Sequence, residues 1–482
     1  MCWGYRELLD SHSILKVLVG ALHYLLPTTM THNTNAGGEA RGGMLEKAKR
    51  TRAASITLAT ASAREKDNAL LRIANALDMS RKELLDANTQ DIVLARRLVD
   101  EGKLSKALLH RLILDDAKIN EMIKSVKDVA QLEDPVGKTL AAIELDAGLE
   151  LYQVSCPIGV IGVIFEARPD ALVQISALCL KTGNAVLLKG GSEARYSNEA
   201  LFKIIARAAA EGSGIPEGWI QLLETREDVN AMLQLNEYID LIVPRGSNQL
   251  VKYIQEHTSI MVLGHSEGIC HVYVDRDANL EMALEISYDA KVQYPAVCNA
   301  AETLLVDAPI AREFLPLMID RYRQAGVEIR ACPRTMELSG RAQQLKPATE
   351  ADWLTEYNDL IISTRVVDGV DEAIEHINHY GSGHTDAIVT ENRATALKFL
   401  QFVDSSSVMH NASTRFSDGF RYGKGAEVGI STYKVHARGP VGLEGLVIYK
   451  YLILGSGQTV APYIGANARN FTHRRLAKHF SL

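Results

Sequence analysis

Apolar residues follow two different spacings along this chain. From Leu45 to about Val129, they recur every three or four positions among charged residues, a pattern typical of amphipathic helices. Further along, short apolar runs without polar alternation are separated by helix-like segments, one opening at Pro169 and another spanning residues 193–210. Such runs predict parallel strands covered on both faces. The predicted strands are residues 160–165, 185–189, 219–223, 241–243, 302–306, 360–367 and 387–390.

Helical segments between consecutive parallel strands are the pattern of a doubly wound sheet. We therefore predict an α/β protein with a helical layer, a doubly wound domain, and a second α/β domain from about residue 269 to 429. The composition agrees with this prediction, because 482 residues allow two or three domains and 47% hydrophobic with 23% charged residues is close to the average of folded proteins.

Charge and the chain ends exclude some classes of partner. The net charge of −7 disfavours broad binding to nucleic acid or anionic membrane. The most apolar early stretch, residues 14–27, is interrupted by Lys16 and His23, is too short to span a bilayer, and lacks the features of a signal peptide. Small and polar residues predict a linker at 31–43, and the basic residues of 467–482 predict a solvated tail.

The cysteine pattern argues against a disulfide scaffold and a zinc ribbon. No CxxC pair occurs among Cys2, Cys156, Cys179, Cys270, Cys298 and Cys332. A reducing compartment, the cytoplasm, is therefore expected. We expect Cys156, Cys179 and Cys270 to be buried apolar thiols. No metal site is predicted, since His376 and His379 lie three apart on a predicted helix without a third ligand.

Two predicted strands end in loops suited to phosphate. One ends in Lys189-Gly190-Gly191-Ser192 and the other in Pro244-Arg245-Gly246-Ser247. Glycine lets a phosphate approach the backbone, so these loops resemble the crevice of a dinucleotide site, with Lys189 as a cation for a ribose or 2′-phosphate. Ordinary connections use the same residues, and the GxGxxG fingerprint is absent.

Cys298 is the candidate nucleophile. It lies in YPAVCNAAETLLV, immediately before a predicted strand. A cysteine at the rim of a sheet can attack a carbonyl, and the backbone N–H of Asn299 can stabilise the resulting oxyanion. A buried thiol is the alternative, and the local residues leave both open. Arg168, Arg415, Arg421 and Arg438 occur in Gly-, Ser- and Asn-rich surroundings and are candidates for binding carboxylate or phosphate, or are solvated surface residues.

Several long blocks resemble one family. These blocks are CPIGVIGVIFEARPDALVQ (156–174), NAVLLKGG (184–191), LGHSEGICHVYVD (263–275), YPAVCNAAETLLV (294–306), INHYGSGHTDAIVTE (377–391), HNASTRFSDGFRYGKGAEVGIST (410–432) and HARGPVGLEGL (436–446). In this order they resemble the γ-glutamyl phosphate reductases of the aldehyde dehydrogenase superfamily, over about residues 45–458.

The resemblance implies a function and a set of partners. It implies NADPH-dependent reduction of L-glutamate 5-phosphate to L-glutamate 5-semialdehyde and phosphate in L-proline biosynthesis, after which the aldehyde cyclises to 1-pyrroline-5-carboxylate. A homo-oligomer is expected, and the acyl phosphate must come from a separate glutamate kinase, with which a transient contact is plausible.

The resemblance also implies an aldehyde dehydrogenase-like layout. An N-terminal extension (1–44), expected to be flexible, would precede an NADP-binding domain (45–135 and 156–272) and a catalytic domain (273–431). An oligomerisation β-hairpin and its partner strand would come from 136–155 and 432–454, and a C-terminal tail from 459–482.

Site residues are implied in the same way. Cys298 falls at the nucleophile's position, with Asn299 following it. The cofactor-binding positions would be Lys189, Gly190, Ser192, Gly246, Ser247 and, on a looser motif, Glu356. Arg168 stands where oxidising members have an asparagine that polarises the carbonyl, and Arg168, Arg415 and Arg438 are the candidates for the substrate's phosphate and carboxylate.

One departure from the superfamily has a chemical meaning. Oxidising members use a glutamate in a Glu-Leu-Gly-Gly block to activate water, and the stretch 263–268 of this chain lacks it. This loss suits a reductase, which should not hydrolyse its thioester. It argues against the nearest alternative, an NAD-dependent dehydrogenase that oxidises a semialdehyde. The presence of Cys298 and both loops argues against a second alternative, a catalytically silent binding protein that retains the fold.

Overall fold

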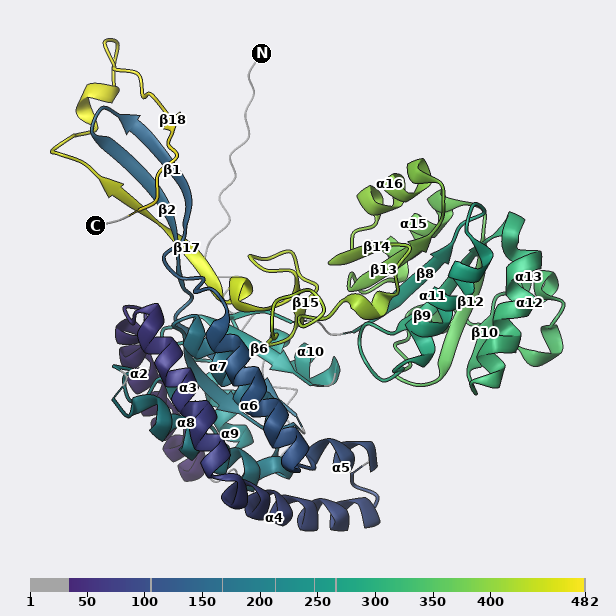
Figure 1. The fold of residues 1–482 in the computed structure, drawn as a ribbon, viewed down its shortest axis with the longest axis horizontal. Helices are drawn as coiled ribbons and strands as arrows, with labels where there is room; N and C mark the ends of the chain where they lie inside the picture. Colours follow the sequence, from purple (N-terminus) through teal and green to yellow (C-terminus); the bar gives the residue numbers. More distant parts are fainter. Residues whose placement is uncertain are drawn as a thin grey trace, which may run out of the picture.

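The computed structural model describes residues 34–104, 106–166, 168–212, 214–246, 248–264 and 267–480. The predicted apolar stretch 14–27 and most of the predicted flexible extension lie outside these residues. Figure 1 shows three parts: a first domain wrapped by the N-terminal helices, a second α/β domain, and a projecting arm built from β1, β2, β17 and β18. None of the described helices is both long and apolar enough to cross a bilayer.

The first domain is built on a five-stranded parallel sheet in the order β5-β4-β3-β6-β7. Its strands are β3 (Val160–Phe165), β4 (Ala185–Lys189), β5 (Ile220–Leu222), β6 (Leu241–Arg245) and β7 (Met261–Val262). Its helices are α2 (Thr34–Leu58), α3 (Ala63–Met79), α4 (Arg81–Asp100), α5 (Lys106–Leu112), α6 (Asp116–Gln131), α7 (Pro169–Lys181), α8 (Arg195–Ala210), α9 (Arg226–Met232) and α10 (Asn248–Glu256). The predicted doubly wound α/β fold with a helical layer is therefore confirmed.

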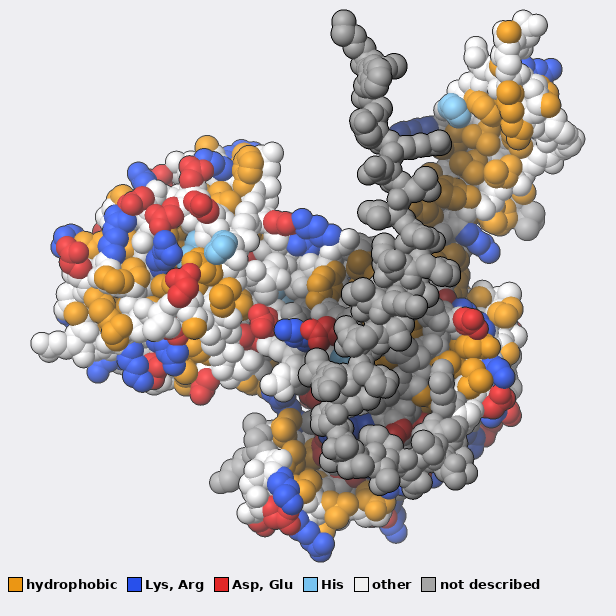
Figure 2. Space-filling model, turned by 180° about the vertical axis from the view of Figure 1, so that it is seen from behind, with side chains coloured by type: hydrophobic (Ala, Val, Ile, Leu, Met, Phe, Trp, Pro, Cys, Tyr) orange, Lys and Arg blue, Asp and Glu red, His pale blue; other side chains and the backbone are white. Residues whose placement is uncertain are grey.

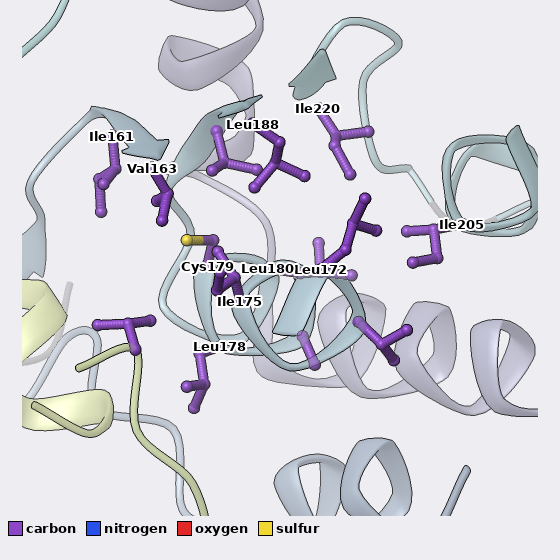
Figure 3. Close-up of a cluster of buried hydrophobic side chains, with 14 of the residues drawn as sticks. Ile161, Val163, Leu172, Ile175, Leu178, Cys179, Leu180, Leu188, Ile205 and Ile220 are labelled. Carbon is purple, nitrogen blue, oxygen red and sulfur yellow. The ribbon is translucent and has the colours of Figure 1, made fainter. Parts of the chain in front are cut away.

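The first-domain core explains the uninterrupted apolar runs. Every residue of β3 is buried, because helices cover both faces of the sheet. Figure 3 shows the sulfur of Cys179 among apolar side chains of the sheet and α7. Burial raises the pKa of Cys179 to about 12, so this cysteine is an inert packing residue, as predicted.

The second domain contains a seven-stranded parallel sheet in the order β11-β10-β12-β9-β8-β13-β14. Its strands are β8 (Cys270–Val274), β9 (Ala301–Asp307), β10 (Glu328–Ala331), β11 (Lys346–Pro347), β12 (Ile361–Val367), β13 (Thr385–Val389) and β14 (Ser407–His410). Its helices are α11 (Leu280–Val292), α12 (Ala308–Gln324), α13 (Pro333–Ser339), α14 (Glu350–Trp353), α15 (Val370–Tyr380) and α16 (Arg393–Phe402). The second α/β domain of the prediction is thus present.

The arm is a four-stranded sheet in the order β17-β2-β1-β18. It consists of the hairpin β1 (Thr139–Asp146) and β2 (Leu149–Pro157), the distant strand β17 (Val447–Leu454), and the two-residue strand β18 (Arg474–Arg475). All of these pairs are antiparallel. Figure 2 shows hydrophobic side chains gathered on this arm.

The tail is largely exposed, as predicted, but it also contacts the arm. Beyond β18, Phe480 packs edge-on against Tyr152 at 5.6 Å between ring centroids, and Lys478 forms an ion pair with Glu150 at 2.6 Å. The basic residues that suggested solvation face acidic residues of β1 and β2, a pairing that the local sequence does not reveal. Cys156 also differs from its prediction, because it lies on β2 and is only partly buried.

Some boundaries lie elsewhere than predicted. The second sheet begins at Cys270, so a boundary at 272 would cut β8. Ala426 and Val428 pack into the first-domain core together with Leu446, although they fall within the predicted catalytic segment and the predicted arm strand. A buried strand has the same apolar pattern in either sheet, so the local sequence does not show which sheet it joins. Helix α2 begins at Thr34, so most of the predicted linker 31–43 is helical.

Candidate active site

Cys298 lies in a turn between α11 and β9. The N–H of Ala300 donates to the carbonyl of Val297 at 2.9 Å and closes this turn, and Cys298 is partly exposed. Gly268 approaches the turn closely, because a Cβ built at Gly268 would lie 2.2 Å from the Cys298 carbonyl oxygen. Only glycine permits this approach. The thiol is therefore at an accessible rim and not inside the hydrocarbon core.

His384 is the residue that sequence reasoning missed. It is fully buried immediately before β13, and its Nε2 lies 3.2 Å from Cys298 Sγ. Its Nδ1 lies 2.8 Å from the Thr385 hydroxyl oxygen, which orients the ring. An imidazole at this distance can exchange a proton with the sulfur. The sequence signal was a polar residue three positions before a predicted strand, but nothing local connects position 384 with position 298.

Three residues meet because their strands are neighbours. Cys270, Cys298 and His384 lie at the amino ends of β8, β9 and β13, which are adjacent in the sheet order. Cys270 Sγ donates to the Cys298 carbonyl at 3.2 Å and lies 3.8 Å from His384 Nδ1. Burial raises the pKa of Cys270 well above its usual value, so Cys270 supports the site as a neutral thiol.

Asn299 anchors the Cys298 turn. Its side-chain amide donates to the carbonyl of Ser417 at 2.8 Å, which ties the turn to the segment after β14. Its backbone N–H donates no hydrogen bond to any part of the chain that the structure describes. That N–H is therefore free to donate a hydrogen bond next to the sulfur.

The predicted arginines occupy three different settings. Arg168 is exposed at the start of α7, and its side chain makes no hydrogen bond or ion pair with the described residues. Arg415 is buried beside the site, where its Nε donates to Gln293 Oε1 at 3.0 Å, and burial lowers its pKa. Arg438 pairs with Asp404 at 3.1 Å and also donates to backbone carbonyls. Arg168 and Arg415 thus have more free hydrogen-bonding capacity than Arg438.

Arg421 donates to the carbonyl of Arg415 and so braces that residue. It is a support for the site and not a separate anion ligand in this geometry. His376 is buried among aromatic rings, and burial lowers its pKa to about 2. The described residues contain no group of His, Cys, Asp and Glu that could hold a metal ion.

The cofactor candidates line the ends of β4 and β6. Lys189 is partly buried at the end of β4, and burial lowers its pKa. Gly190 follows it, and a Cβ there would lie 2.2 Å from Asn198 Nδ2. A Cβ at Gly246 would lie 2.8 Å from the Glu166 carboxyl, so neighbouring side chains fill the space beside both glycines and leave no room for a larger residue. Ser192 is exposed, and Ser247 lies outside the described residues.

Glu356 contacts the segment after β6 from the second domain. Its Oε2 accepts from Asn248 Nδ2 at 3.3 Å, and Asn248 opens α10 two residues after Gly246. Glu267, which sequence reasoning did not single out, faces Glu356, and burial raises the pKa of Glu267.

Comparison with known proteins agrees with the observed fold and with the resemblance of the sequence blocks described above. The aldehyde dehydrogenase family model matches residues 28–335. The chain is 56% identical over 438 residues to the γ-glutamyl phosphate reductase of Methanococcoides burtonii, covering 90% of this chain and 98% of that relative. The crystal structure of γ-glutamyl phosphate reductase from Thermotoga maritima superposes with a TM-score of 0.83 at 45% identity, covering 86% of this chain and 99% of that chain.

A more distant structure carries the same fold. Glyceraldehyde-3-phosphate dehydrogenase GapN from Methanocaldococcus jannaschii, solved in complex with NADP, matches with a TM-score of 0.61 at 18% identity, covering 86% of this chain and 95% of that one. The chain therefore belongs to the aldehyde dehydrogenase family and, within that family, to the γ-glutamyl phosphate reductases.

Proposed function

We propose that this protein reduces L-glutamate 5-phosphate to L-glutamate 5-semialdehyde and phosphate with NADPH, in L-proline biosynthesis. The observation that carries the proposal is the contact of 3.2 Å between Cys298 Sγ and His384 Nε2 at an accessible rim. The names of relatives at 56% and 45% identity supply the substrate class. The aldehyde product then cyclises to 1-pyrroline-5-carboxylate.

The first half-reaction uses Cys298 and His384. His384 Nε2 accepts the thiol proton, and the sulfur attacks the acyl carbon of the mixed anhydride. The new carbon–sulfur bond replaces the bond to the bridging oxygen, and that bond's electron pair departs with the phosphate. The thiol proton passes to the departing phosphate, so the products are a thioester on Cys298 and hydrogen phosphate. The Asn299 N–H stabilises the oxyanion during attack.

The second half-reaction regenerates the thiol. NADPH, when bound, supplies a hydride to the thioester carbonyl. The resulting thiohemiacetal on Cys298 collapses to the aldehyde, and His384 returns a proton to the departing sulfur, with one solvent proton consumed overall. The chain's contribution is orientation and charge. The stretch 263–268 lacks the usual water-activating glutamate, and this favours reduction over hydrolysis of the thioester.

The cofactor and substrate contacts follow from the same geometry. Lys189, Gly190, Ser192, Gly246, Ser247 and Glu356 would hold the dinucleotide. Lys189 is suited to the 2′-phosphate that distinguishes NADPH from NADH. Arg168 and Arg415 would bind the substrate anions, and Arg438, already paired with Asp404, would support them. Because the substrate is labile, we also propose transient contact with the kinase that makes it, in the cytoplasm.

The reverse reaction tests this function most directly. The purified protein should oxidise glutamate 5-semialdehyde only when inorganic phosphate is present, and NADP should be preferred over NAD. The measurement is absorbance at the reduced-nicotinamide band with each cofactor, with and without phosphate. Steady formation of glutamate without phosphate would instead identify an oxidising aldehyde dehydrogenase.

The arm is proposed to bind a second copy of the chain. Strand β17 is an edge strand that exposes Tyr449, Tyr451 and Ile453. Unpaired backbone groups beside apolar side chains favour pairing with another strand. Figure 2 shows the apolar surface of the arm.

This arrangement predicts a change of mass. Tyr451→Asp combined with Ile453→Asp should lower the oligomer mass measured by light scattering, because both side chains are more than half exposed and would put charge into an apolar interface. The matched control is Leu354→Asp, an exposed apolar residue away from the arm. An unchanged mass in the double variant would exclude this edge as the interface.

A further inference from the structure

Arg245 occupies the junction between the cofactor loop and the nucleophile. It is the last residue of β6, directly before Gly246, and its carbonyl accepts from the Glu166 N–H at 3.2 Å. Its Cγ lies 3.8 Å from where a Cβ on Gly429 would stand. The side chain therefore runs between the end of the first-domain sheet and the segment that returns after β14.

The guanidinium of Arg245 has unused hydrogen-bonding capacity. Its Nη1 is buried and finds no acceptor among the described residues. Buried guanidinium N–H groups are normally paired, because leaving them unmatched is costly. Burial lowers the pKa of Arg245, although guanidinium stays charged in proteins. A charged donor without a partner at this position points to an external acceptor.

Charged groups of both signs surround Arg245. The charged or ionisable groups close enough to act on it are Glu427, Arg168, Asp170 and Cys298. Arg168 follows β3, the strand adjacent to β6, and its side chain also makes no hydrogen bond or ion pair with the described residues. Two guanidiniums with unmatched N–H groups thus stand at neighbouring strand ends, and that of Arg245 is close enough to Cys298 to interact with it electrostatically. Each can bind a phosphate in a bidentate manner.

We propose that Arg245 binds the phosphoryl group of the acyl phosphate and stabilises it as it leaves, with Arg168 as its neighbour on the same anion. This inference rests on the proposed function. At neutral pH the acyl phosphate carries two negative charges on its phosphoryl group, and cleavage of the carbon–oxygen bond brings a third onto it until the proton arrives. A guanidinium at that position acts where charge develops, and this is how electrostatic catalysis works.

The reverse reaction tests this role, because phosphate is needed for only one of its two steps. Without phosphate, one equivalent of NADPH per site should form as Cys298 becomes acylated, and only the later release of the acyl group needs phosphate. In Arg245→Ala, the size and rate of this burst should match those of the unchanged protein. The KM for inorganic phosphate should rise about 10- to 100-fold. Arg245→Lys should recover part of the loss, and added guanidinium ion should partly rescue the alanine variant.

A second measurement does not depend on turnover. Inorganic phosphate should slow alkylation of Cys298 by iodoacetamide, and Arg245→Ala should raise the concentration that gives half-protection by a similar factor. Arg334→Ala is the control, since Arg334 pairs with Asp368 at 2.5 Å on the second domain's surface. A phosphate KM and half-protection within two-fold of the unchanged protein would overturn the inference.

The outcomes distinguish three cases. If NADPH formation by the unchanged protein does not respond to phosphate, the proposed function itself is wrong. If it does respond and Arg245→Ala behaves normally, only the role of Arg245 is wrong. If the variant instead weakens NADPH binding ten-fold, measured by nicotinamide fluorescence, and leaves the phosphate KM unchanged, Arg245 serves the dinucleotide phosphates and the inference is overturned.

Discussion

Replacing Cys298 with alanine should lower turnover by at least about 10⁴-fold, because the thioester cannot form without the sulfur. The burst of NADPH from semialdehyde in the absence of phosphate should disappear as well, since hydride transfer requires the thiohemiacetal on this residue. The affinity for NADPH, measured by fluorescence, should stay within about three-fold of the unchanged protein. Loss of turnover and of the burst, together with normal NADPH binding, would show that the variant is folded but cannot carry out the reaction.

The matched control for this variant is Cys156→Ala. Cys156 is also a partly exposed thiol, and it lies on β2 of the arm, away from the site. It should keep full activity and a full burst. Iodoacetamide should inactivate the Cys156 variant as fast as the unchanged protein, because the thiol that matters is still present. A Cys298→Ala protein that retained even one hundredth of the normal rate would end the thioester mechanism.

Replacing His384 with alanine or asparagine should lower kcat about 100-fold, the usual contribution of a positioned acid–base group. The cause is the loss of the group 3.2 Å from Cys298 Sγ that takes up and returns the thiol proton. The KM for semialdehyde should change little. The alkylation rate of Cys298 at neutral pH should fall with kcat, because only the thiolate reacts.

Two control comparisons accompany this second prediction. His379→Ala removes an exposed histidine from α15 and should leave both rates unchanged. His384→Asn replaces the buried ring with a smaller polar side chain that cannot carry the proton, so an equal loss in both His384 variants points to proton transfer. Alkylation rates within two-fold of normal in both variants, with an intact near-ultraviolet spectrum, would show that His384 does not act on the thiol.

The sequence by itself determined the fold class and much of the strand placement. Every residue of Val160–Phe165 is apolar or glycine, because helices cover both faces of that strand, and the structure has the predicted bounds. Lys189 and Gly246 were placed in phosphate-type loops because the residues after each strand are informative without any distant contact. Cys298 was found in the same way, next to a strand that its own neighbours define.

The local sequence does not reveal contacts between segments that are far apart along the chain. Arg474 and Lys478 pair with Glu144 and Glu150, more than 300 positions earlier, so local composition predicted the exposure of the tail but not its contacts with the arm. The strand that begins at Cys270 joins the second sheet and not the first, because strand order depends on which edges pair.

The candidate active site likewise combines residues that local sequence marks with contacts that only the fold creates. Residue type and local pattern mark Cys298 as a thiol at the rim of a sheet, but they do not supply its partner. His384 and Cys270 meet it because β9, β8 and β13 are neighbours in the second sheet. Arg245 reads as an ordinary loop residue until β6 lies beside β3 and the segment after β14 folds over its side chain. Sequence pattern is a property of neighbours along the chain, whereas proton transfer and anion binding depend on distances of a few ångströms that only tertiary packing decides.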